Sequence, residues 1–307
     1  MTLAGLRVPQ RGAVCRIPDA KVSDTRLGRP FVNFCMRLPP YLIPMLALTA
    51  ACSRDVRIPE AAASDTATHT STVARWPHDT GAIGPPGPAG LPASGFPAPR
   101  RPISSIVSPQ WSDEATRDAA HEADTVMALL GVRPGMSVAD IGAGSGYYVA
   151  RMARRVGPTG LVYGQDIMPR YLRYLRERVD RDELSNVRLV LGDPHDPRLP
   201  HDAVDLVTMI HMYHEIEQPF GLLTNLVPAL RPGARIAILD MNRRTDQHGT
   251  PPALLKCELE AVGYRQQSIH DLGVDGYVAI FTAPASVNLP HIAPAVRGCD
   301  AVAERGQ

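Results

Sequence analysis

Apolar residues in this chain form short runs that alternate with stretches of helical spacing. Five runs are nearly continuous, which is typical of strands buried on both faces of a parallel sheet: "SVADI", "LVYGQDI", "NVRLVLGD", "AVDLVTMI" and "RIAILDM". Two further strand candidates, "YRQQSIHD" and "GYVAIFTA", follow them. The pattern therefore predicts seven strands.

Helical patterns stand before and between these strands. The stretch "SDEATRDAAHEADTVMALLGVRPG" opens with capping residues and ends in a glycine and a Pro-Gly turn, and Gly146 to Val156 carries apolar residues at helical spacing. A helix opens at Pro169, and two more lie in "FGLLTNLVPAL" and "PPALLKCELEAVG". The alternation predicts an α/β fold with a doubly wound, mostly parallel seven-stranded sheet.

Composition divides the chain into parts. The patterned sequence occupies residues 111–284 and predicts one folded domain. Residues 53–110 are rich in Ala, Pro and Gly and predict a linker, because they carry too few apolar side chains to offset the entropy of ordering. Residues 1–35 lack a hydrophobic period and are either unstructured or upstream of the true start, and residues 285–307 predict a flexible tail.

Residues 36–52, "MRLPPYLIPMLALTAAC", combine a basic residue, an apolar stretch and small residues before a cysteine. This order resembles a bacterial lipoprotein signal, in which Cys52 becomes the lipidated first residue and translation begins at Met36. The resemblance implies a domain anchored by lipid in the cell envelope, at the periplasmic side. The alternative is an unstructured leader, which the prolines favour, on a cytoplasmic protein.

Charge and cysteine content exclude some functions. The net charge is +1 and aromatic residues make up 5% of the chain, so no nucleic-acid surface is predicted. The five cysteines include no CxxC pair, so neither a zinc site nor a disulfide framework is signalled. Cys257 lies within a predicted helix and is expected to pack in the core.

The first strand leads into a glycine-rich loop, "VADIGAGSGYY". In a doubly wound sheet, ligands bind beyond the carboxyl ends of the strands. Gly142 and Gly144 fit a nicotinamide-binding G-x-G-x-x-G turn, but Tyr147 stands where that turn needs its third glycine. The third glycine is Gly146, and the preceding Asp140 would repel a pyrophosphate but suits a cationic amino group.

Asp140, Gly142, Gly144 and Gly146 complete a D/E-x-G-x-G-x-G motif and in this resemble class I S-adenosylmethionine-dependent methyltransferases. The resemblance covers residues 111–284 and implies a Rossmann-like methyltransferase fold, with the loop against the methionine part of S-adenosylmethionine. It also implies that Asp166 binds the ribose hydroxyls and that Asp193 meets the adenine. "HMYHEI" and "HGTPP" further resemble a group of poorly characterised bacterial predicted methyltransferases, which implies no substrate. The family's Pro-Gly-Gly turn before the fifth strand reads Pro-Gly-Ala here.

Candidate catalytic residues follow the fourth strand in "HMYHEI". His214 with Glu215 is suited to proton abstraction near neutral pH, and His211 is a second candidate. Tyr213 and His248 are expected to contact the substrate. The alternative is a purely structural role, in which one histidine forms a hydrogen bond with the backbone and Glu215 caps a helix.

The H-x-x-H spacing of His211 and His214 also raises the possibility of a metal, with a third ligand from Glu215, Asp240 or His248. A loop is a weak setting for such a pair, and no metal is predicted.

The favoured function is therefore S-adenosylmethionine-dependent methyl transfer to a small-molecule acceptor. The alternative is a non-catalytic methyltransferase-like binding domain held at the membrane. A nicotinamide oxidoreductase ranks third because of Tyr147. An exported domain would work where S-adenosylmethionine is not made, which is in tension with the favoured function.

Overall fold

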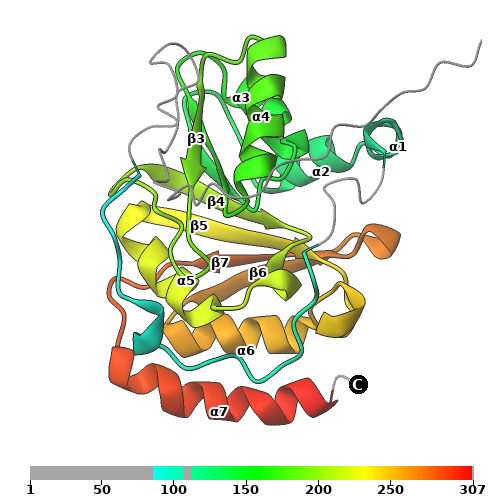
Figure 1. Ribbon diagram of the computed structural model, residues 1–307. Helices are drawn as coiled ribbons and strands as arrows, with labels where there is room; N and C mark the ends of the chain where they lie inside the picture. Colours follow the sequence, from blue (N-terminus) through cyan, green and yellow to red (C-terminus); the bar gives the residue numbers. More distant parts are fainter. Residues whose placement is uncertain (1–85, 107–112, 306–307) are drawn as a thin grey trace, which may run out of the picture. The chain divides into compact units, whose positions relative to one another are not determined.

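The computed structural model describes residues 86–106 and 113–305 (Figure 1). The expected lipoprotein-type signal at 36–52, the stretch before it and most of the expected linker lie outside the described residues. Within the described part of the chain, no helix has the length and apolar character needed to cross a membrane.

Seven strands form one sheet in the order β3-β2-β1-β4-β5-β7-β6. The first five strands are parallel, whereas β7 runs antiparallel to both of its neighbours, β5 and β6. This confirms the predicted doubly wound, mostly parallel sheet. The strands are β1 (Ser137–Ile141), β2 (Leu161–Asp166), β3 (Val187–Leu191), β4 (Val204–Ile210), β5 (Leu230–Asp240), β6 (Arg265–Asp271) and β7 (Tyr277–Thr282).

Helices cover both faces of this sheet and bury a separate apolar cluster on each (Figure 1). One face is covered by α2, α3 and α4, and the other by α5, α6 and α7. The helices are α1 (Glu114–Ala119), α2 (Glu122–Leu129), α3 (Tyr147–Val156), α4 (Pro169–Arg181), α5 (Pro219–Leu226), α6 (Pro252–Val262) and α7 (Leu289–Arg305). Short 3₁₀ helices are η1 (Ala93–Gly95), η2 (Tyr213–Glu215), η3 (Val227–Ala229), η4 (Thr245–Gln247) and η5 (Gly273–Asp275).

The first predicted helix is broken in two. Asp113 caps α1 by accepting a hydrogen bond from the Thr116 backbone N–H, as the capping pattern predicts. The chain then turns at His121, whose φ of 54° is left-handed, and α2 begins after it. The break allows α1 and α2 to present different side chains to the same neighbouring helix.

The last part of the predicted linker lies against the domain. We call residues 86–106 the strap, which Figure 1 draws in cyan beside α6. Its backbone bonds to side chains of the domain, because Gly90 N–H donates to Asp196 at 2.7 Å and Leu91 N–H donates to Asn225 at 2.8 Å. These side chains satisfy strap backbone groups that do not pair with a neighbouring strand, as expected for a segment rich in proline and glycine.

The predicted flexible tail contains α7, which packs against α6. Ile292, Val296 and Cys299 are buried on the inner side of α7. Cys257 in α6 forms a disulfide with Cys299, across a Cα–Cα distance of 5.6 Å, so the expectation that Cys257 is a plain core residue is wrong. Neither α7 nor the disulfide could be predicted from the sequence. Pro294 interrupts the helical pattern of α7, and the 42-residue separation of the two cysteines matches no motif.

Candidate functional site

A cavity of about 210 Å³ opens at the carboxyl ends of β1, β2 and β4. The strand order reverses at this point, because the chain adds β2 and β3 on one side of β1 and β4 and β5 on the other. The cavity is lined by predicted site residues from these three strand ends and from the end of β3: Asp140, Gly142, Gly144, Asp166, Asp193, His211 and Glu215.

The glycine loop requires glycines for two physical reasons. Gly142, Gly144 and Gly146 all have positive φ, at 70°, 55° and 83°. A Cβ on Gly142 would stand 2.8 Å from the Met212 side chain, and one on Gly146 would collide with Leu175. The loop therefore presents bare backbone at the start of α3, as the sequence predicts.

Asp140 lies at the end of β1 and is 3% exposed. It accepts a hydrogen bond from Thr208 Oγ1 at 2.8 Å. Burial raises the pKa of Asp140 to about 7, while Thr208 and Arg117 oppose the shift and Asp166 adds to it. The carboxyl group is thus poised to change charge near neutral pH.

Asp166 ends β2 and uses both carboxylate oxygens. It accepts hydrogen bonds from the backbone N–H of Gly144 at 2.9 Å and of Met168 at 2.8 Å. Burial raises its pKa, against the effect of these bonds. Asp193, in contrast, is exposed at the rim of the cavity. The two acids therefore occupy the inner and outer parts of one cavity.

Gln165 and Arg117 line the cavity but were not identified from the sequence. Gln165 has a buried Nε2 without a hydrogen-bond partner among the described residues. Arg117 reaches the cavity from α1, stacks over Tyr147 with Cζ 3.9 Å from the ring centroid, and forms two hydrogen bonds with Glu122 at 2.8 and 2.6 Å. An isolated glutamine and an arginine on a polar helix carry no sequence signal.

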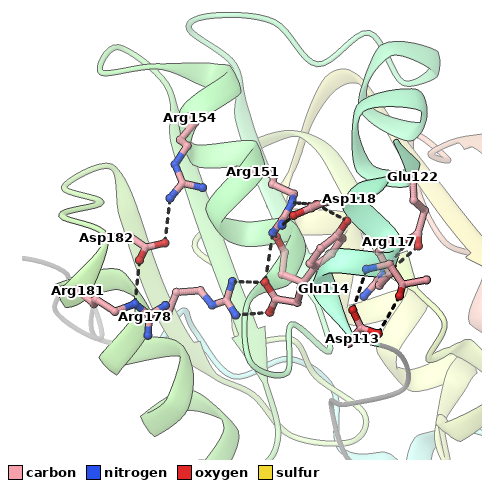
Figure 2. Close-up of polar contacts among 12 residues, drawn as sticks. Asp113, Glu114, Arg117, Asp118, Glu122, Arg151, Arg154, Arg178, Arg181 and Asp182 are labelled. Atoms are coloured by element: carbon pink, nitrogen blue, oxygen red, sulfur yellow. Dashed lines mark hydrogen bonds and ion pairs between the residues drawn. The ribbon is translucent and has the colours of Figure 1, made fainter. Parts of the chain in front are cut away.

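Charged pairs hold α1 over the helices that flank the cavity, as Figure 2 shows. Asp118 on α1 pairs with Arg151 on α3, and Glu114 on α1 pairs with Arg178 on α4. The hydroxyl of Tyr147 also donates to Asp118 at 2.9 Å. Several of these side chains are partly exposed, so their contribution is to position Arg117 rather than to stabilise the fold strongly.

His211 follows β4 in a left-handed conformation, with a φ of 52°. Its side chain lines the cavity, and its Nδ1 is buried without a hydrogen-bond partner among the described residues. Burial lowers the pKa of His211, so the neutral imidazole is favoured. A neutral imidazole that lines a cavity is suited to accept a proton.

His214 is not among the residues that line the cavity. It is 2% exposed, and its Nδ1 is 3.0 and 3.1 Å from the two carboxylate oxygens of Asp240. Glu215, its neighbour on η2, does line the cavity. The expected pairing of His214 with Glu215 is loose, with 4.0 Å between Nε2 and Oε1.

The two expected substrate contacts lie apart from the cavity. Tyr213 is fully buried in the core, where its hydroxyl donates to Glu258 at 2.9 Å. His248 lies on the loop after β5, with its ring centroid 5.4 Å from that of His214. The structure thus brings His248 to His214 and does not bring Tyr213 to the cavity.

Comparison with known proteins agrees with this architecture. Residues 133–274 match a family described as a methyltransferase domain. The chain is 32% identical over 126 residues to a protein-L-isoaspartate O-methyltransferase of Methanothrix thermoacetophila, covering 40% of this chain and 56% of the relative. It is 32% identical over 120 residues to the ubiquinone/menaquinone biosynthesis C-methyltransferase UbiE of Pseudomonas putida, covering 39% of this chain and 47% of the relative. The chain thus spans about half the length of the curated relatives it matches.

Among solved structures, a SAM-dependent methyltransferase from Aquifex aeolicus aligns with a TM-score of 0.51 and 22% identity, over 56% of this chain and 100% of that one. At this identity the match establishes the fold. The architecture is the Rossmann-like fold that the glycine motif implied.

Proposed function

We propose that this chain, which carries a methyltransferase domain at residues 133–274, transfers a methyl group from S-adenosylmethionine to a small-molecule acceptor. S-adenosylmethionine is the cofactor that the family and the fold indicate. One observation carries the proposal: the glycine loop, Asp140 and Asp166 converge on a single cavity at the strand ends.

The cofactor's parts match the chemistry along this cavity. The bare backbone of the glycine loop and the carboxyl group of Asp140 suit the methionine end, whose amino group is cationic. Asp166 suits the ribose, since two hydroxyl groups can donate to its carboxylate. Asp193 at the rim suits the adenine end, and Arg117 adds positive charge for the methionine carboxylate.

The acceptor is proposed to be small because the remaining walls are apolar and partly enclosed. Ile210, Met212, Ile216 and Leu222 line the cavity beside His211 and Glu215. An acceptor lone pair would attack the methyl carbon in line, the S–C bond would break, and its electron pair would remain on sulfur as a neutral thioether. A proton lost by the nucleophile would pass to His211 or Glu215. Alignment of this kind supplies about 7–11 kcal/mol in well-oriented systems.

Asp166→Ala tests the cofactor site. The variant should weaken S-adenosylmethionine binding by at least about 100-fold, because two charge-assisted hydrogen bonds worth about 1.5–3 kcal/mol each are lost. Calorimetry on the full chain measures this change. Asp193→Ala is the matched control and should cost only a few-fold, about 1 kcal/mol or less, since Asp193 is exposed. Equal binding by wild type and Asp166→Ala would overturn the proposed site.

Methyl transfer is tested separately with donor labelled in its methyl group and a pool of cell metabolites. The proposal expects the label to appear in a small molecule in the presence of the wild-type chain. Tight donor binding with no transfer between pH 6 and 9 would instead support the non-catalytic binding domain.

The pKa of Asp140 gives a pH dependence to donor binding. Below pH 7 most of the ligand-free protein carries a proton on Asp140. The cationic amino group of the donor binds the deprotonated carboxylate, so this proton must be lost when the donor binds. Raising the pH from 5.5 to 7 should therefore tighten the dissociation constant about tenfold, and a further rise in pH should tighten it by about twofold at most. Measurements stop at pH 7.5, because an α-amino group loses its proton near pH 8 (about 7.7–8.0). Asp140→Asn should bind more weakly and lose most of this dependence; an unchanged pH profile in that variant would contradict the assignment.

We further propose that the domain works in the cell envelope, attached through lipidated Cys52, which requires S-adenosylmethionine to reach that compartment. Two features support this: the signal-like pattern at 36–52, and the Cys257–Cys299 disulfide, because disulfides persist in oxidising compartments. Intact mass of the native protein tests the attachment. A lipid on Cys52 and no residues before it are expected, and a lipid-free chain that retains the earlier residues would end the idea.

A further inference from the structure

We propose that His214, Glu215 and His248 bind a divalent transition-metal ion beside the cavity. One ligand atom from each side chain lies within 4.8 Å of the others. In the part of the chain that the structure describes, this is the one group of three or more His, Cys, Asp or Glu side chains whose ligand atoms converge in this way. The three residues come from two loops, η2 after β4 and the turn after η4 that follows β5, which the parallel sheet places side by side.

Asp240 orients His214 as a metal ligand. Its carboxylate holds Nδ1 of His214, which leaves Nε2 directed to the side of Glu215. Asp240 also accepts hydrogen bonds from Thr250 Oγ1 at 2.7 Å and from the Met241 backbone N–H at 2.8 Å, and it is fully buried. A histidine whose second nitrogen is fixed by a carboxylate is the usual arrangement behind a bound metal, because it sets the tautomer and raises the basicity of the ligand nitrogen.

His248 is held in an unusual backbone conformation next to His214. Its φ is 56° and its ψ is 60°, which is left-handed and uncommon for a residue with a side chain. Its backbone N–H donates to Ser104 Oγ of the strap at 3.3 Å, and the Ser104 hydroxyl donates to the Thr245 carbonyl. The strap thereby fixes the turn that places the two imidazole rings edge to face.

The donor set indicates the kind of ion. Two imidazole nitrogens and one carboxylate suit Zn²⁺ and related divalent ions, whereas Mg²⁺ and Ca²⁺ prefer oxygen ligands. A tetrahedral ion with bonds of about 2.1 Å places its ligands about 3.4 Å apart, so ligand atoms that now lie within 4.8 Å of one another need to approach by up to about 1.4 Å. Three protein ligands leave one position open, which is the pattern of catalytic rather than structural metal sites.

Glu215 joins this site to the cavity, because it belongs to the metal-ligand group and also lines the cavity. An acceptor oxygen that occupied the open position would lose its proton more easily, since a bound divalent ion stabilises the resulting negative charge. This role in methyl transfer rests on the proposed function, whereas binding of the ion does not. His211 takes no part in the group, so the H-x-x-H spacing is not the one that the structure uses.

The test uses the full, tag-free chain after treatment with a chelator, and Zn²⁺ or Co²⁺ alone as the probe. Calorimetry should show one Zn²⁺ per chain, and Co²⁺ should give the visible absorption of a four-coordinate site. His248→Ala and Glu215→Gln should each weaken Zn²⁺ binding at least tenfold. Asp240→Asn should weaken it about 10–100-fold, as expected for a positioning residue behind a ligand. His201→Ala, at an exposed histidine outside the group, is the matched control and should bind as the wild type does.

Donor binding by each variant checks that it is folded, since S-adenosylmethionine is proposed to use a different part of the cavity. A wild-type chain that binds the donor but no Zn²⁺ would overturn the metal site and leave the methyltransferase intact. Unchanged Zn²⁺ affinity in both His248→Ala and Glu215→Gln would also overturn the metal site. Zn²⁺ binding without donor binding would support the metal site and overturn the proposed function.

Discussion

Replacing His211 with asparagine should lower the rate of methyl transfer by about 10²–10⁴-fold, the usual contribution of a general base. The reason is that the His211 side chain lines the cavity and that burial lowers its pKa, so its neutral imidazole is available as a base. Asparagine is chosen since it tolerates the left-handed backbone at this position. The rate is measured as transfer of labelled methyl to the acceptor pool that the wild-type chain modifies.

Donor affinity separates catalysis from structure in this experiment. It should be nearly unchanged in His211→Asn, so that the loss lies in turnover. His201→Asn is the matched control, as His201 is exposed and lies outside the cavity lining. A His211→Asn variant that transfers methyl at the wild-type rate would exclude His211 as the base.

Arg101→Ala should lower the free energy of unfolding by about 3–5 kcal/mol, the cost of removing one partner from a buried ion pair. The side chains of Arg101 and Glu258 are 1% and 2% exposed, and Nε lies 2.9 Å from Oε1. Arg101 also donates to the backbone carbonyls of Tyr213 and His214, at 3.2 and 3.4 Å. Its loss would leave a buried carboxylate and two carbonyls without their donor. Denaturant unfolding gives the free energy, and limited proteolysis reports release of the strap.

A second pair provides the contrast. Arg231 and Asp205 form an ion pair with side chains 42% and 33% exposed, so Arg231→Ala should cost less than about 1 kcal/mol. Arg101→Met combined with Glu258→Met should be more stable than Arg101→Ala, because no charge is left buried. If Arg101→Ala and Arg231→Ala cost the same, the strap does not depend on its buried arginine.

The sheet and the cofactor loop could be predicted because their signals are local. A nearly continuous apolar run such as Val187–Leu191 is recognisable without its neighbours, and the spacing of three glycines defines a turn by itself. The acid at each strand end then follows from topology. The reversal of β7 is not local: only the pairing with β5 and β6 reveals it.

The rest depended on contacts between distant parts of the chain. Arg101 and Glu258 are 157 residues apart, and neither has neighbours that mark it as buried. His214 was expected in the cavity, but its direction is set by Asp240, 26 residues later. Tyr213 was expected near substrate, yet its hydroxyl is used in the core by Glu258. A sequence motif places the backbone of such residues, whereas long-range partners decide where their side chains point.

The strap and α7 lie outside residues 133–274, the segment that matches the methyltransferase-domain family, yet both pack against α6. A fragment limited to residues 133–274 would leave the buried carboxylate of Glu258 without Arg101. It would also expose the apolar surface that Ile292 and Val296 cover. Aggregation is the usual fate of such newly opened apolar area. We therefore expect that a stable fragment of this chain must include the strap and α7, because both cover apolar or charged groups of α6.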